Sequence, residues 1–83
     1  MRARVLYFAA VRDLVARDEE DLELPPDVRT VDDFARFIAR ARPELEGRMA
    51  HVRIARNEAF AHPSDPLAEG DVLALIPPVA GGR

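Results

Sequence analysis

Few residues in this chain could carry chemistry, and the most suggestive are two adjacent glycines close to its last residue, Gly81 and Gly82. Glycine loses more conformational freedom on ordering than any other residue, so a glycine pair favours neither a strand nor a helix. What the pair offers is a backbone without Cβ atoms, thin enough to enter a narrow active site of another protein. Ordinary fraying of a chain terminus is the alternative. The pair alone leaves both interpretations open.

The side chains that usually catalyse reactions form no recognisable set. The chain has no cysteine, which excludes a thiol nucleophile, disulfides and thiolate metal sites. Its two histidines, His51 and His62, lack the spacing of metal ligands, and we expect both to be partly exposed structural residues. Ser64 lies between a proline and an aspartate, which is typical of a turn. The sequence therefore predicts a protein without a bound cofactor or metal that is acted on, or that completes the site of another protein.

Composition limits the kind of protein further. With 83 residues, of which 48% are hydrophobic, we expect one small domain with little interior for a deep catalytic pocket. The net charge of -3 argues against nucleic acid as the main partner. Arg12 and Asp13 interrupt the N-terminal apolar run too early for a signal peptide, and no stretch approaches the length of a membrane span. We therefore expect a cytoplasmic protein that binds neither membrane nor nucleic acid.

Hydrophobic patterning predicts five strands and one main helix. The helix is expected to begin after Thr30, whose side chain can cap it, and to stop before Pro43. The apolar run 72–76 predicts a buried central strand, and the acidic strand 18–24 predicts a charged sheet edge, with a docking patch for basic partners as the alternative. The other strands are expected at 2–9, 52–54 and 59–61, with a short helical turn at 10–16. This order predicts an α+β roll with one helix across a mixed sheet.

Motifs at both ends make the chain resemble one known family. Residues 5–14 (VLYFAAVRDL) are similar to the first strand and turn of the small subunit of molybdopterin synthase. Residues 65–71 (DPLAEGD) and 75–82 (LIPPVAGG) are similar to its last turn, last strand and tail. The resemblance covers essentially the whole chain. It implies a ubiquitin-like β-grasp domain over residues 1–78, a flexible Gly-Gly tail over 79–83, and a sulfur-carrier role.

The resemblance also implies a sequence of reactions. In that family the carboxylate of the terminal glycine is adenylated with ATP by an adenylyltransferase that resembles ubiquitin-activating enzymes. Sulfur from a persulfide protein then displaces the adenylate and leaves a thiocarboxylate. The tail enters the large subunit, with which the small subunit forms a heterotetramer, and gives its sulfur to cyclic pyranopterin monophosphate in molybdenum cofactor biosynthesis. The carrier would thus supply sulfur without an active site of its own.

The resemblance implies roles for the residues at positions that match the family's motifs. Gly82 would bear the thiocarboxylate, and Gly81 would provide clearance in the partner's site. The partner-binding residues would be Phe8, Phe60 and Ile76, together with Pro77 and Pro78. Because most apolar strand residues face inward, plain core positions are the alternative for the first three.

Two positions depart from the family pattern. Arg83 follows the glycine pair and would displace the reactive carboxylate by about 3.5 Å. Either Arg83 is removed, or it is not native, or the protein works differently. Arg56 stands where relatives usually carry an apolar residue, which leaves the local strand register open.

Three other functions stay open at this stage: a thiamine-pathway sulfur carrier, a ubiquitin-like protein modifier, and a non-covalent β-grasp docking module whose tail Arg83 blocks. The chain has no lysine, so none of its side chains could accept an isopeptide bond.

Overall fold

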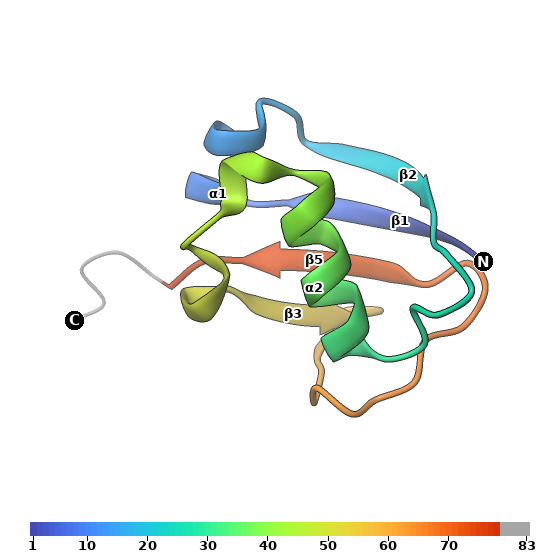
Figure 1. Cartoon of the computed structure of the whole chain (residues 1–83). Coiled ribbons are helices and arrows are strands. Elements are labelled where there is room, and N and C mark those ends of the chain that lie inside the picture. The colour runs from blue at the N-terminus through green and yellow to red at the C-terminus, as the bar shows by residue number, and fades with distance from the viewer. Residues whose placement is uncertain (79–83) are drawn as a thin grey trace.

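A mixed five-stranded sheet and one long helix form the body of the protein (Figure 1). The computed structural model describes residues 1–78, so the predicted tail 79–83 lies outside the described residues. The elements are β1 (Arg2–Tyr7), α1 (Ala9–Val15), β2 (Glu19–Glu23), α2 (Val31–Ala41), the 3-10 helices η1 (Pro43–Leu45) and η2 (Met49–His51), β3 (Arg53–Arg56), β4 (Ala59–Phe60) and β5 (Val72–Ile76). Their order in the sheet is β2-β1-β5-β3-β4. The α+β roll predicted from the sequence is confirmed.

The first and last strands are neighbours in the middle of the sheet. β1 runs parallel to β5, with Tyr7 opposite Leu75, whereas the other neighbouring strands are antiparallel. The central position predicted for residues 72–76 and the edge position predicted for the acidic strand are both confirmed. The parallel pairing makes β1 and β5 end on the same side of the molecule, so Phe8 and Ile76 come close together.

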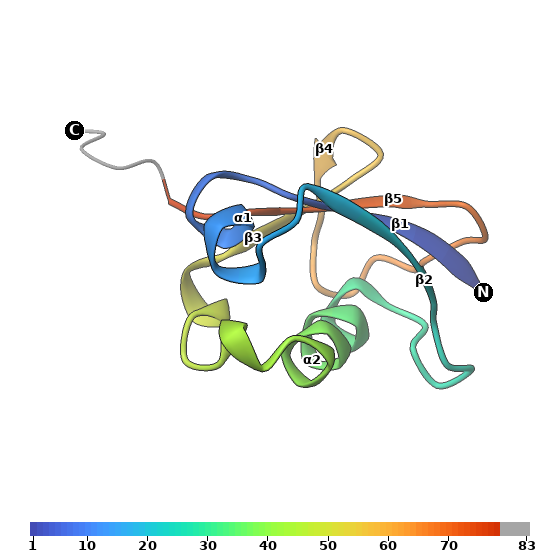
Figure 2. The same cartoon turned by 90° about the horizontal axis from the view of Figure 1, so that it is seen from above.

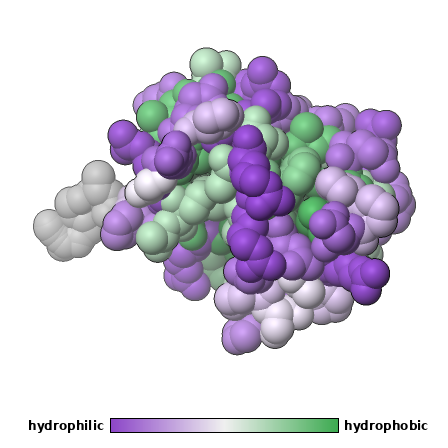
Figure 3. Space-filling view, in the orientation of Figure 1, coloured by the Kyte–Doolittle hydropathy of each residue, from purple (hydrophilic) through white to green (hydrophobic). Residues whose placement is uncertain are grey.

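The core lies between the sheet and α2. Figure 2 shows α1 and α2 on the same side of the sheet, which leaves the other side uncovered by helices. Because strand side chains alternate between the two faces, every second residue of β1 and β5 points at the helix. The largest fully buried side chains are Phe34, Leu24, Ile38, Leu45, Leu73, Leu75 and Val5. Over α2 the outer surface carries a band of hydrophilic side chains, as Figure 3 shows.

The start of α2 follows from local chemistry. The Thr30 hydroxyl accepts a hydrogen bond from the backbone N–H of Asp33 at 3.1 Å, and the Asp33 carboxylate accepts one from the backbone N–H of Thr30 at 3.2 Å. This capping box satisfies two backbone donors that the first turn leaves free. The apolar face predicted for this helix is confirmed, since Val31, Phe34 and Ile38 are buried.

Strand boundaries differ from the prediction by one residue at the ends of β2 and β4 and more clearly at β1 and β3. β1 ends at Tyr7 instead of residue 9, because the Phe8 carbonyl accepts hydrogen bonds from Val11 (3.0 Å) and Arg12 (3.2 Å) and so begins α1. β3 runs from Arg53 to Arg56 instead of over residues 52–54, because the 3-10 helix η2 ends directly before it.

A partly buried carboxylate ties the edge strand to the rest of the domain. Glu20 lies on the α2 side of β2, where it accepts hydrogen bonds from the Tyr7 hydroxyl, from Arg17 (2.8 Å) and from Arg42 Nε (2.8 Å). Burial by itself raises the pKa of Glu20, but the hydrogen bonds from Arg42 and Tyr7 outweigh it and hold this pKa below its ordinary value. The acidic strand is therefore integrated into the fold, as the edge-strand interpretation predicts.

The substitution Glu20→Gln is expected to lower the free energy of unfolding by about 2 kcal/mol at neutral pH, because the partly buried guanidinium of Arg42 then loses the negative charge that it pairs with. A group whose folded-state pKa is lowered contributes stability above its unfolded-state pKa, and this stability is lost as the pH falls through the folded-state value. The difference between wild type and variant should therefore shrink as the pH falls below about 4. Urea unfolding across this pH range measures it, with Glu19→Gln on the other face of β2 as the control.

Candidate functional site

An apolar surface occupies the side of the sheet opposite α2. Among residues 1–78 no element covers it, and it surrounds a shallow depression of about 600 Å³. We call this surface the open face and define it by Leu6, Phe8, Ala55, Phe60, Val72, Ala74 and Ile76. Exposed apolar surface of this kind on a small domain commonly marks an interaction site.

The three apolar residues singled out from the sequence meet on the open face. Phe8 is 44% exposed and Phe60 is 56% exposed, while Ile76 is half-buried. The parallel pairing of β1 with β5 brings Phe8 next to Ile76. Phe60 lies on β4, where it pairs with Ala55 of the open face. None of the three belongs to the buried core, so the plain-core alternative does not describe them.

Charged side chains border the open face on two sides. Along β1 and β2, Arg4 pairs with Asp21 (2.9 Å) and with Glu19 (3.4 Å). On β3, the guanidinium carbon of Arg53 lies 3.9 Å from the centroid of the Phe60 ring, which is a cation–π contact. Sequence reasoning missed this contact, because the strand pattern assigned Arg53 only to an exposed position between two apolar residues.

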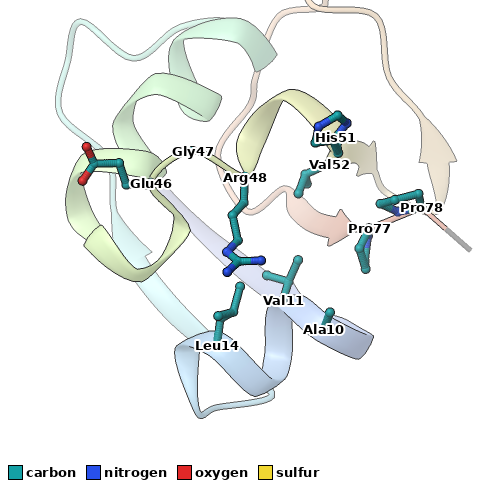
Figure 4. Close-up of a pocket in the computed structure, with 10 residues that line it drawn as sticks. All are labelled: Ala10, Val11, Leu14, Glu46, Gly47, Arg48, His51, Val52, Pro77 and Pro78. Carbon is teal, nitrogen blue, oxygen red and sulfur yellow. The ribbon is translucent and has the colours of Figure 1, made fainter. Parts of the chain in front are cut away.

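Pro77 and Pro78 form the root of the tail, between the open face and a second hollow. This groove of about 450 Å³ is lined by Ala10, Val11, Leu14, Glu46, Gly47, Arg48, His51, Val52, Pro77 and Pro78. Figure 4 shows the Arg48 guanidinium lying across it toward Val11 and Leu14, while the Glu46 carboxylate points away. Both prolines are accessible, Pro77 in part and Pro78 more fully. Gly81 and Gly82, the predicted reactive residues, lie outside the described residues.

The histidines form no catalytic arrangement with their neighbours. His62 Nδ1 lies 2.8 Å from the Ser64 hydroxyl and accepts the Ser64 backbone N–H at 3.2 Å. The Asp65 carboxylate binds the backbone N–H of His62 at 3.0 Å and not the ring, so nothing orients the imidazole as a catalytic triad requires. This exposed loop is a turn, and His51 is exposed beside the groove. Within residues 1–78 no cluster of three or more metal-binding side chains occurs.

Asp71 explains why an arginine is accommodated at position 56, where the family usually has an apolar residue. Its carboxylate is only 5% exposed and accepts hydrogen bonds from Arg56 Nε (2.7 Å), Asn57 Nδ2 (3.1 Å) and the backbone N–H of Ala68 (2.8 Å). Asn57 also accepts the backbone N–H of Val72 at 2.9 Å. Arg56 thus fixes the β3–β4 hairpin, which carries Phe60, to the start of β5.

Comparison with known proteins assigns the chain to a family. The family model described as "ThiS family" matches residues 5–82. The chain belongs to the ThiS family. Curated relatives named molybdopterin synthase sulfur carrier subunit match it closely: the protein of Chlamydomonas reinhardtii is 38% identical, over 99% of this chain and 100% of the relative. That of Mycobacterium tuberculosis is 35% identical over 99% of each chain.

Solved structures share the fold of this chain. SAMP1 of Haloferax volcanii superposes with a TM-score of 0.85 at 29% identity, over 99% of this chain and 100% of its own. A chain from a complex of subunits 1 and 2 of the molybdopterin-converting factor of Helicobacter pylori has the same fold (TM-score 0.71, 24% identity, 99% and 100% coverage). The resemblance and the ubiquitin-like β-grasp fold predicted from the sequence are confirmed. No helix within the described residues could span a membrane.

Proposed function

We propose that this ThiS family chain is the sulfur-carrier subunit of molybdopterin synthase, with Gly82 as the residue that carries sulfur. The observation that carries the proposal is the position of the open face, which ends at the root of the Gly-Gly tail in a chain similar over its whole length to relatives of that name. A partner that covers the open face is thereby placed to receive the tail. From Pro78, four residues reach about 13 Å into such a partner.

The chemistry asks little of the carrier itself. A carboxylate is a poor electrophile until one of its oxygens belongs to a good leaving group, and adenylation with ATP by the activating adenylyltransferase supplies that group. The terminal sulfur of the persulfide then displaces AMP and forms an acyl disulfide at Gly82. A thiol reductant cleaves the S–S bond, which leaves the thiocarboxylate on Gly82 and releases the donor and reductant thiols as a disulfide. Gly81 admits the tail to the narrow site where cyclic pyranopterin monophosphate accepts the sulfur. Tethering makes this transfer effectively intramolecular, and the large subunit provides the electrostatic stabilisation.

The proposal assigns partners accordingly. The large subunit docks on the open face, in contact with Phe8, Phe60 and Ile76 and with the root residues Pro77 and Pro78, and completes a heterotetramer. The adenylyltransferase and the persulfide protein act on the tail in turn. ATP binds to the adenylyltransferase and not to this chain, and we place the protein in the cytoplasm.

Intact-mass measurement tests the proposal directly. Chains that end at Gly82 and at Arg83 are incubated with the adenylyltransferase, ATP, a persulfide donor and a thiol reductant, and then with the large subunit and pyranopterin precursor. We expect the chain ending at Gly82 to gain the mass difference between sulfur and oxygen, and to lose it again on transfer. The chain ending at Arg83 should remain unchanged until Arg83 is removed. A Gly82 chain that never acquires sulfur would contradict the carrier function.

A second function is favoured by the likeness to SAMP1 and by a 38% identity over 61 residues to small archaeal modifier protein 1 of Haloferax volcanii. In that function Gly82 forms isopeptide bonds with lysines of target proteins. Conjugates that survive a denaturing gel and require both the adenylyltransferase and Gly82 would support it. The absence of lysine means that further copies could be added only at the N-terminus.

A further inference from the structure

Arg53 is the charged residue at the tail end of the open face. In the sheet register it lies opposite Ile76, the last residue of β5 and a member of the open face. Its guanidinium carbon is 3.9 Å from the centroid of the Phe60 ring. Arg53 therefore stands beside two of the residues expected to contact the large subunit, and next to the point where the tail begins.

The other arginines of the sheet already have partners. Arg4 is paired with Asp21 at 2.9 Å, and Arg56 is held by the buried Asp71 at 2.7 Å. Glu58, on the turn that follows Arg56, lines the same depression as Phe60, but it lies at the end of β3 opposite to Arg53. Within residues 1–78 Arg53 forms no ion pair, and its one specific contact is with the Phe60 ring. A positive charge on this border is thus available to a partner.

The contact with Phe60 prepares Arg53 for a carboxylate. A guanidinium stacked on an aromatic ring contacts the ring with the flat face of the guanidinium. The N–H donors lie at the edge of the guanidinium plane and remain accessible. Holding the long side chain on the ring also reduces the rotamer freedom that is lost on binding. The fork of donors matches both oxygens of a carboxylate, and such a pair strengthens when a partner excludes water around it.

We propose that Arg53 is a specificity residue of the open face, and that the large subunit presents a carboxylate to its guanidinium next to the apolar contacts at Phe60 and Ile76. The inference rests on the proposed function, because it takes the large subunit as the protein that covers this face. It adds a requirement that apolar contact does not impose: the surface that covers Arg53 must carry an aspartate or glutamate.

The test measures the affinity for the large subunit of the same organism, with Arg53→Glu, Arg53→Leu and Arg53→Lys compared at low and high salt. We expect Arg53→Leu to weaken binding about tenfold, and Arg53→Glu to weaken it by a further factor of about ten because like charges then face each other. Arg53→Lys should fall between wild type and Arg53→Leu, since lysine keeps the charge and loses the fork. Added salt should weaken the wild-type complex more than the Arg53→Leu complex. Arg40→Glu, on α2, is the matched control and should bind like wild type.

Two results would overturn the inference. Wild-type affinity in Arg53→Glu would show that no carboxylate faces this position. Equal losses in Arg53→Leu and Arg53→Glu, with unchanged salt dependence, would show that Arg53 acts only through its packing on Phe60. In either case a loss of affinity in Phe8→Arg would leave docking on the open face, and so the proposed function, intact. Thermal unfolding of each variant confirms that the exposed position tolerates the change.

Discussion

The substitution Phe8→Arg is expected to weaken binding of the large subunit by about 100-fold or more and to change the stability of the domain little. Phe8 is 44% exposed and lies outside the core, so the isolated domain gives up little packing when it is replaced. Docking on the open face would remove the new guanidinium from water next to the apolar side chains of Leu6 and Ile76. The hydration that the charge loses there is what makes the expected effect large.

Isothermal titration of the large subunit against wild type and Phe8→Arg measures this effect. Phe8→Leu should retain most of the affinity, because it keeps an apolar side chain at the same place. Glu44→Arg introduces positive charge in η1, away from the open face, and should bind nearly as wild type does. If Phe8→Arg bound as tightly as wild type, the docking surface would have to lie elsewhere, for example at the groove beside Pro77 and Pro78.

The substitution Asp71→Ala is expected to lower the free energy of unfolding by about 3 kcal/mol. The buried carboxylate satisfies donors from Arg56, Asn57 and the backbone of Ala68, and its loss leaves all three without a partner. The β3–β4 turn holds Asn57 and Glu58 at positive φ angles of 51° and 74°, and without Asp71 the Asn57–Val72 hydrogen bonds have to hold it. Phe60 should therefore lose its fixed place on the open face as well.

Urea unfolding measures the loss, and Asp13→Ala, an exposed change on α1, should alter stability by less than about 0.5 kcal/mol. Burial raises the pKa of Asp71, but the hydrogen bonds from Arg56, Ala68 and Asn57 outweigh it and lower the pKa overall. Its contribution is therefore present at neutral pH and lost as the pH falls through the folded-state value. A difference between wild type and Asp71→Ala that stayed constant down to about pH 2 would contradict this account.

Local patterns were sufficient for the elements of this fold. Hydrophobic patterning and the capping residue Thr30 predict α2, and hydrophobic patterning predicts the strands. The boundary errors arise where a few backbone hydrogen bonds decide, as at the Phe8 carbonyl, which accepts two and begins α1. Such bonds depend on the path of the chain in space, which residue periodicity does not specify.

The candidate site was less accessible to pattern reasoning. Phe8, Phe60 and Ile76 were assigned a common surface through family resemblance, and the pairing of β1 with β5 shows physically why they meet. Asp71 and Arg53 could not be recognised, because their contacts join residues whose side chains meet only after the sheet has formed. A single aspartate after a glycine is an ordinary turn residue, and nothing local distinguishes it from a buried hydrogen-bond acceptor.

The neighbouring positions of the first and last strands have a consequence for synthesis of the protein. β1 leaves the ribosome before the other strands, whereas its central partner β5 emerges after all of them. Pairing between strands so distant in sequence is slow to form, and it cannot begin before β5 has been synthesised. A nascent chain that stops before residue 72 has no middle to its sheet and no finished open face. The open face thus depends on translation through β5, because this strand contributes Val72, Ala74 and Ile76 to it.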